Sequence, residues 1–500
     1  MHNSSPSQGS AVSERRWLAL AVLLAAASMN LIDLTIVSVA MPAIQHRLHA
    51  TAAETEWILA AYALPFALGL ITGGRLGDIF GRRRMFLIGV LGFTLASIVC
   101  GAASSTALLI AGRAVQGIFA AAMMPQVLAS IHVLFTGKER GKALGMWGSV
   151  LGLATIGSPI LGALLLKLGL HWRPIFLVNV PVGAIALAGA LAWLPESRSE
   201  HPLRIDLGGV ALCSLALLLL CYPLIEGRQL GWPAWTFVMI AASIPAFAAF
   251  AVYQRGIGED GSPLVPMGLF AERGFSAGVV LGLVFFSGIV GFGLVLQLAL
   301  QNGLGFSAMH GALTVLPFSV GIVIASPFGM QLVGKLGRRL IFAGAGLMVL
   351  GSVAVIIAVR SAGSGLSTLD LVPGMLICGF GVGTVAPSLV SVALAEVRGA
   401  EAGAASGLIG SANQVGSAIG VATMGAIFFA LLPKGGVLHP AHDYITALSG
   451  AMWYELGVFA LSLVLALLLP AAVAPAAAGA GTAEGAETDV GRAGALASVE

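Results

Sequence analysis

Two side chains of opposite charge lie inside long apolar segments of this sequence. Asp33 falls in the run 17–40 and Arg113 in the run 107–130. If the runs cross a bilayer in opposite directions, both charges lie about 10 Å below its outer face. Ionisable residues are costly there and mark function. Burial favours the neutral carboxyl, while a nearby cation favours the charged form. The pair therefore indicates proton binding and release; the alternative is a fixed salt bridge that only joins two helices.

Uncharged polar residues accompany this pair. Asn30 lies one turn before Asp33, and Gln116 one turn after Arg113. A helix that is apolar all round would not need such a face, so we expect it to line a central cavity. Hydrogen bonding between helices is the alternative. The residues expected to line a substrate cavity are Asn30, Tyr62, Gln116 and Gln414.

A charged, glycine-rich loop follows the second apolar run. It contains Gly74, Asp78, Gly81, Arg82 and Arg83. The glycines allow a tight turn. We expect Asp78 to accept hydrogen bonds from cytoplasmic N–H groups or basic side chains, and so to lock an inner gate when the protein faces outward. The alternative is that the arginines only keep the loop inside the cell.

The composition predicts which elements position these residues. Of 500 residues, 58% are hydrophobic and 9% charged, against about 25% charged in a soluble domain. A membrane-spanning helix needs about 20 apolar residues. Fourteen runs qualify: 17–40, 56–76, 84–104, 107–130, 143–166, 172–194, 206–226, 235–253, 275–300, 308–334, 339–359, 369–393, 403–430 and 450–470. The uncharged stretch 275–334 is divided at the turn-prone segment 301–305.

The placement of Lys and Arg predicts the orientation. With the N-terminus inside, eighteen of the 25 basic residues fall inside and six outside, and Arg113 stays within a span. We therefore predict a multi-pass protein of the cell (inner) membrane with both termini cytoplasmic.

Several classes of site are absent from the sequence. The net charge of +3 suggests no nucleic-acid partner, and the four cysteines form no CxxC pair. We expect no metal and no cofactor. Neither an HExxH-like spacing nor a GxxxxGK[ST] motif occurs, which argues against a membrane enzyme and against direct use of ATP. A receptor or scaffold would typically carry a soluble signalling domain, and no segment is long enough for one.

An internal repeat indicates two related halves. The loop 74–84 has a weaker copy at 332–339, and superposing their Gly-Arg-Arg triplets puts Gly334 where Asp78 stands. The predicted fold is all-α, with six-helix bundles at 17–194 and 275–470 and an inserted helix pair with its loops at 195–274. Residues 1–16 and 471–500 are expected to be cytoplasmic tails, the second of them disordered.

Two further sets of residues are candidates for helix bending and for additional substrate contacts. Gly145, Pro159 and Gly162 recur at helical spacing in the fifth run, where glycine and proline permit bending. Static packing is the alternative. Glu226 and Glu455 are candidate extra substrate contacts near the outer ends of their runs. For Glu455, the adjacent Trp453 and Tyr454 favour a place in the interfacial aromatic belt.

The sequence resembles the major facilitator superfamily, specifically its fourteen-helix drug:proton antiporters. The likeness covers roughly residues 17–470. It rests on Asp33 to Pro42, Gly74 to Arg84, Arg113 to Gly117, His171 to Gly183, Glu226-Gly227 with Gly231-Trp232, and Gly403 to Gly407 with Gln414 and Gly416. In the fifth-helix antiporter motif, Gly145, Pro159 and Gly162 match, whereas Ala154 and Ser158 replace usual glycines, which weakens the case for antiport.

This resemblance implies a proton-coupled exporter of hydrophobic drugs, antibiotics or biocides, and no enzyme. Its partners would be a hydrophobic small molecule, protons and the lipid bilayer, with a periplasmic adaptor protein left open. A facilitator that exports or imports one specific metabolite is the alternative. A membrane receptor or scaffold is the alternative from a different class of function.

Overall fold

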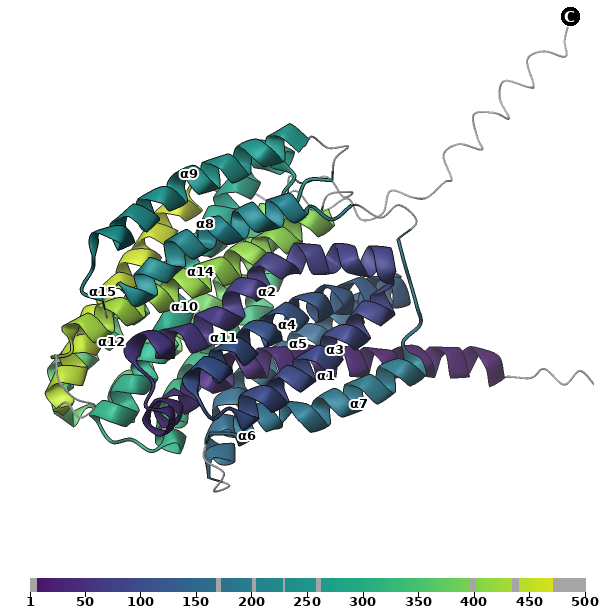
Figure 1. Cartoon of the computed structure of the whole chain (residues 1–500). Coiled ribbons are helices and arrows are strands. Elements are labelled where there is room, and N and C mark those ends of the chain that lie inside the picture. Colours follow the sequence, from purple (N-terminus) through teal and green to yellow (C-terminus); the bar gives the residue numbers. More distant parts are fainter. Residues whose placement is uncertain are drawn as a thin grey trace, which may run out of the picture.

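The computed structural model is a bundle of long helices (Figure 1). It describes residues 7–167, 172–199, 204–227, 230–257, 262–395, 397, 402–433 and 440–470. Within these ranges no strand occurs, and fourteen helical segments are long and apolar enough to cross a membrane. The predicted all-α fold and the number of spans are confirmed.

Seven helices form the N-terminal bundle: α1 (Ser7–Leu48), α2 (Ala52–Phe80), α3 (Arg82–Ala102), α4 (Thr106–Leu134), α5 (Gly137–Leu166), α6 (Pro174–Leu177) and α7 (Asn179–Trp193). The short α6 and α7 together make one span. The inserted pair is α8 (Leu207–Glu226) and α9 (Ala234–Ile257), followed by a 3₁₀ turn at Met267–Ala271.

The C-terminal bundle contains α10 (Arg273–Leu298), α11 (Ala308–Leu336), α12 (Arg338–Ala362), α13 (Thr368–Ala393), α14 (Ala402–Leu431) and α15 (Ala441–Ala466). A short π-helix, Ala299–Gly303, ends α10, and a 3₁₀ turn, Gly363–Gly365, follows α12. The chain turns between α10 and α11 close to the predicted 301–305, where Gly305 has φ of +69°. Glycine alone adopts this conformation without a steric penalty.

The structure describes part of the first predicted tail. Helix α1 begins at Ser7, so residues 7–16 are helical and continuous with the first span. A polar segment can extend an apolar span because the helix already supplies the hydrogen-bonded nucleus. The predicted tail 471–500 lies outside the described residues.

Both bundles bring helix backbones into close contact through glycine. In the N-terminal bundle, a side chain on Gly117 of α4 would collide with the backbone carbonyl of Tyr62 on α2. In the C-terminal bundle, one on Gly379 of α13 would collide with that of Phe318 on α11. Lipid gives helices no hydrophobic drive to associate, so van der Waals contact between small residues holds them together.

The repeated Gly-Arg-Arg triplets occupy equivalent places. Gly81 and Gly337, with φ of +107° and +49°, begin α3 and α12. Arg83 donates to the carbonyls of Ala190 and Leu191 at the end of α7, over 3.2 and 2.6 Å. Arg338 donates to the carbonyls of Leu467 and Leu469 at the end of α15, over 3.0 and 3.3 Å. These cations satisfy free carbonyls at the negative helix ends.

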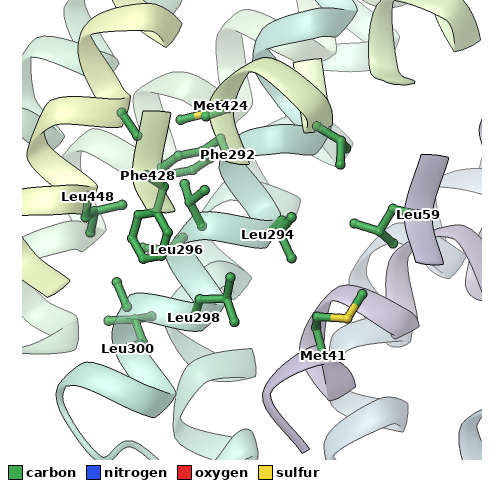
Figure 2. Close-up of a cluster of buried hydrophobic side chains, with 14 of the residues drawn as sticks. Met41, Leu59, Phe292, Leu294, Leu296, Leu298, Leu300, Met424, Phe428 and Leu448 are labelled. Atoms are coloured by element: carbon green, nitrogen blue, oxygen red, sulfur yellow. The ribbon is translucent and has the colours of Figure 1, made fainter. Parts of the chain in front are cut away.

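The bundles meet at the end that holds the connection between α1 and α2, predicted to be extracellular and here called the outer end. Figure 2 shows Met41 and Leu59 across from Leu294 and Leu298 of α10, all within one buried apolar cluster. Gln301 Nε2 donates to the Val39 carbonyl over 2.9 Å, and Asn302 Nδ2 to Gln45 Oε1 over 3.1 Å. The outer end is therefore closed between the bundles.

The inserted helix α8 lies along the junction of α2 and α14, with α9 outside it (Figure 1). Leu217 and Cys221 of α8 share an apolar cluster with Leu64 of α2 and Ala418 of α14. Near the outer end, Trp57 Nε1 donates to Glu226 Oε1 over 2.9 Å. This contact gives Glu226 a structural partner on α2.

At the inner end, two side chains tie the inserted pair to α2. The Arg75 guanidinium donates to the backbone carbonyls of Arg204, Ser262 and Pro263. Asp206 caps α8, accepting from the Gly209 amide over 2.7 Å and from Gln254 Nε2 of α9 over 2.7 Å. Although burial opposes its charged form, these hydrogen bonds outweigh that effect and lower the Asp206 pKa. The linkers on both sides of the pair are thus fixed to the N-terminal bundle.

Candidate proton-coupling site

Asp33 of α1 and Arg113 of α4 form an ion pair inside the N-terminal bundle. Both side chains are buried, at 0% exposure. Arg113 also donates from Nε to the Ile58 carbonyl of α2 over 3.1 Å, and from Nη1 to Gln116 Oε1 over 3.0 Å. The predicted contact between the two charges is therefore present, and it links three helices.

Two amides and a hydroxyl complete the surroundings of the carboxylate. Gln116 Nε2 donates to Asp33 Oδ1 over 3.3 Å, and Asn179 Nδ2 of α7 donates to the same oxygen over 2.9 Å. The same two amide nitrogens contact Ser97 Oγ of α3, over 2.7 and 3.3 Å. A buried charge needs hydrogen bonds as well as a counter-ion, and this network supplies both.

Aromatic rings close the site around Arg113. Its guanidinium carbon lies 4.3 Å from the ring centre of Tyr62 and 5.9 Å from that of Phe176. The Tyr62 hydroxyl donates to Asn30 Oδ1, so the ring is fixed from α1. Rings packed on a desolvated cation stabilise it through their quadrupoles and keep water away.

The arrangement leaves Arg113 with partners in either protonation state of Asp33. When the carboxylate takes up a proton, its attraction for Arg113 falls, but the Ile58 carbonyl and Gln116 still accept from the guanidinium. The cost of stranding a buried cation is thereby reduced. These two contacts of Arg113 do not depend on the charge of Asp33.

The structure places the predicted site residues in two groups. Asn30, Tyr62 and Gln116 lie with the ion pair, buried and hydrogen-bonded to it or to each other. Gln414 is half-buried on α14 in the other bundle.

Sequence reasoning missed Ser97 and Asn179 as members of the site. Asn179 carried a usable signal, because it is the only amide in the apolar run 172–194. Ser97 carried none, since hydroxyls bond to their own helix in many spans, and Ser97 also donates to the Phe93 carbonyl over 2.9 Å.

The segment predicted as a gate loop is helical except at Gly81, because α2 continues to Phe80 and α3 begins at Arg82. In this conformation its polar side chains make local contacts. Asp78 pairs with Arg82 over 2.9 Å, one turn along the chain. The backbone amide of Arg83 donates to Glu196 Oε1 over 3.1 Å. Gly74 lies near Pro125 of α4, where an added side chain would meet the ring at 3.7 Å. The contact expected in an outward-facing state stays a prediction.

Asp78→Asn is expected to shift the protein toward inward-facing conformations. One lost charge-assisted hydrogen bond is worth roughly 1–3 kcal/mol, which changes a balanced equilibrium about five-fold or more. Ile71 and Gly407 face each other between the bundles. In a background without the four native cysteines, Ile71→Cys or Gly407→Cys should therefore react faster with a polar thiol reagent. Gly334→Ala is the matched control, since its new methyl group meets nothing within 4 Å; equal labelling in Asp78→Asn and its parent would contradict a gate.

The three residues of the predicted bending motif have different surroundings on α5. A side chain on Gly162 would lie 2.7 Å from Ile36 of α1, so this glycine permits close contact between α1 and α5. One on Gly145 would meet nothing within 4 Å. Pro159 lies inside the helix, and the neighbouring Ser158, buried at 0%, hydrogen-bonds to Thr35 of α1.

The expectation that Glu455 sits in an interfacial aromatic belt is wrong. Its exposure is 2%, whereas that of Trp453 is 52%. Helix α15 starts at Ala441, nine residues before the predicted span, so Glu455 lies about 21 Å along the helix from its outer end.

Comparison with known proteins agrees with this architecture. The sequence matches the Major Facilitator Superfamily over residues 23–421. It is 39% identical to the probable actinorhodin transporter of Streptomyces coelicolor, over 84% of this chain and 73% of the relative. It is 35% identical to the multidrug resistance protein Stp of Mycobacterium tuberculosis, over 81% and 74%, and 34% identical to the puromycin resistance protein pur8 of Streptomyces alboniger, over 91% of both.

Solved structures agree on the fold alone. A D-xylose-proton symporter superposes with a TM-score of 0.64 at 15% identity, covering 91% of this chain and 98% of the other. With the matched segment, the fourteen spans and the two bundles in place, the family predicted from the motifs is confirmed: this chain is a multi-pass membrane transporter that belongs to the major facilitator superfamily.

Proposed function

We propose that this protein exports hydrophobic small molecules, such as antibiotics, dyes and biocides, in exchange for protons. The observation that carries the proposal is the buried ion pair of Asp33 and Arg113. Ionisable residues inside membrane-spanning helices are costly, and they mark substrate, ion or proton pathways. The names of relatives, which include a multidrug resistance protein and a tetracenomycin C resistance and export protein, support the class of substrate.

In the proposed cycle, proton binding to Asp33 depends on which end of the protein is open, and the structure has its outer end closed. With that end closed, substrate enters from the cytoplasm between the bundles. Reopening outward delivers it to the outer side, where Asp33 takes up a proton. When the protein returns to the inward-facing state, Arg113 attracts the carboxylate again and Asp33 releases the proton. Asn30, Tyr62, Gln116 and Gln414 contribute to the cavity, and Asp78, Arg82 and Arg83, with Gly74 and Gly81, form the inner gate of the outward-facing state.

The proposal includes the arrangement in the cell. The protein lies in the cytoplasmic (inner) membrane with both termini in the cytoplasm, and its bundles span 17–194 and 275–470 around the inserted segment 195–274. Lipid surrounds it, and an adaptor protein is a partner to be sought. Bending at Gly145, Pro159 and Gly162 of α5 accompanies the change between states.

A second candidate is the export of one specific metabolite. It is favoured by the relatives named for actinorhodin and for tetracenomycin C, each a single compound. The breadth of substrates separates the two candidates.

The test is a susceptibility panel in an efflux-deficient host, with dyes, biocides and antibiotics. Expression of the protein should lower the accumulation of several chemically unrelated compounds, and a protonophore should restore their accumulation. Protection against a single compound would favour the specific exporter. Unchanged accumulation of every compound, with the protein present in the membrane, would overturn drug export.

A further inference from the structure

The C-terminal bundle contains a buried carboxyl that the cycle above does not use. Glu455 of α15 is 2% exposed, and its Oε2 has no hydrogen-bond partner in the described part of the chain. It lies near Cys378 on α13 and the buried Ser352 on α12. The three side chains form a polar cluster among α12, α13 and α15.

This cluster occupies the place that the network of Asp33 has in the first bundle. Aligning the two Gly-Arg-Arg triplets puts Ser352 one residue from the position of Ser97. Aligning the two Ser-Thr pairs that begin α4 and α13 puts Cys378 on the position of Gln116. Glu455 lies on the last helix of its bundle, as Asn179 does. The repeat thus provides a second polar site, with its acid on the last helix instead of the first.

The described residues around Glu455 offer no cation to pair with it. On α12, Arg360 donates to Ser449 over 2.9 Å and lies over the Trp453 ring, six residues or about 9 Å along α15 from Glu455. On α13 the ionisable groups are Cys378 and the helix-capping Asp370. On α15 itself, Tyr454 turns away to Ser287 of α10, over 3.1 Å. The spans of α10 beyond Arg273 and of α14 contain no ionisable residue.

An ionised carboxylate in such surroundings would lack a counter-ion, and its Oε2 would lack a hydrogen bond. Its desolvation costs far more than the uptake of a proton, so a group of this kind is neutral.

We propose that Glu455 is a second proton-binding site, which is loaded in this conformation and exchanges its proton with water. Two carboxyls, Asp33 ion-paired and Glu455 neutral, would then be present in the two bundles at once. The role of Glu455 in transport rests on the function proposed above, whereas proton binding itself can be measured without any substrate.

The experiment is infrared spectroscopy of the purified protein in lipid vesicles, which detects the C=O stretch of a protonated carboxyl. At neutral pH the wild type should show such a band, and the band should shift in heavy water and disappear as the pH is raised. Glu455→Gln should lose it. Glu226→Gln is the matched control and should keep it, because Glu226 already has a hydrogen-bond partner in Trp57.

Two results would overturn the proposal. One is a band that is unchanged in Glu455→Gln. The other is a Glu455 band that neither shifts in heavy water nor responds to pH, because a carboxyl that never exchanges its proton is only structural. Glu455→Asp, which keeps the acid, should retain a titrating band and covers the case in which Glu455→Gln fails to fold. Failure of the efflux panel would leave this result untouched, so the two proposals can fail separately.

Discussion

Asp33→Asn is expected to abolish proton-driven export while the protein stays folded in the membrane. Asparagine keeps the shape of the side chain and an oxygen that can accept from Asn179, but it cannot carry a proton in the relevant pH range. Uptake of a fluorescent substrate into everted vesicles, driven by a pH gradient, should fall to the level of vesicles without the protein.

Asp370→Asn is the matched control for this change. Asp370 is an aspartate at the start of α13, where it caps the helix through Ser367. Its replacement should weaken only this cap and leave uptake close to that of the wild type. Full uptake by Asp33→Asn vesicles would remove Asp33 from the coupling mechanism.

Arg113→Met is expected to destabilise the protein strongly, because it leaves a buried carboxylate without its cation. Breaking a buried pair on one side costs roughly 3–5 kcal/mol. The double variant Asp33→Asn/Arg113→Met removes both charges, so its loss should be smaller than the sum of the two single losses by about 0.5–3 kcal/mol. Thermal unfolding in detergent measures all four forms of the cycle.

An exposed arginine provides the control for this cycle. Arg360→Met removes a cation that lies over Trp453 near the membrane surface, where an ion contact is worth little. The stability losses caused by Arg360→Met and by Asp33→Asn should be additive. Strict additivity of Asp33→Asn with Arg113→Met would show that the two side chains do not interact in the protein in the membrane.

The spans and the ion pair could be predicted because both follow from length along a helix. Apolar runs of about 20 residues must cross a bilayer, and a fixed rise per residue gives Asp33 and Arg113 a common depth. The uncharged stretch 275–334 divides into two spans near the predicted 301–305, because Gly305 adopts a backbone conformation that does not continue a helix.

The faces of the helices could not be predicted in the same way. Trp453 and Glu455 are two residues apart, which places them about 200° apart around α15. One side chain therefore faces outward and the other is buried. Proximity to an aromatic residue in the sequence does not predict which face of the helix a side chain occupies. Asn179 reaches Asp33 because α7 packs against α1, and Ser97 joins the network because α3 packs against α4 and α7. Packing of this kind is a tertiary property that a single run does not contain.

The position of α8 decides how a compound dissolved in the bilayer can approach the centre of the protein. Two bundles meet along two seams, α2 with α14 and α5 with α11. Helix α8 covers the first seam, held at the outer end by Trp57 and at the inner end by Arg75, and α9 backs it. The inserted pair packs at this seam and not at the other. In the described part of the chain, the inserted pair therefore shields the seam of α2 and α14 from lipid and leaves that of α5 and α11 without such a cover.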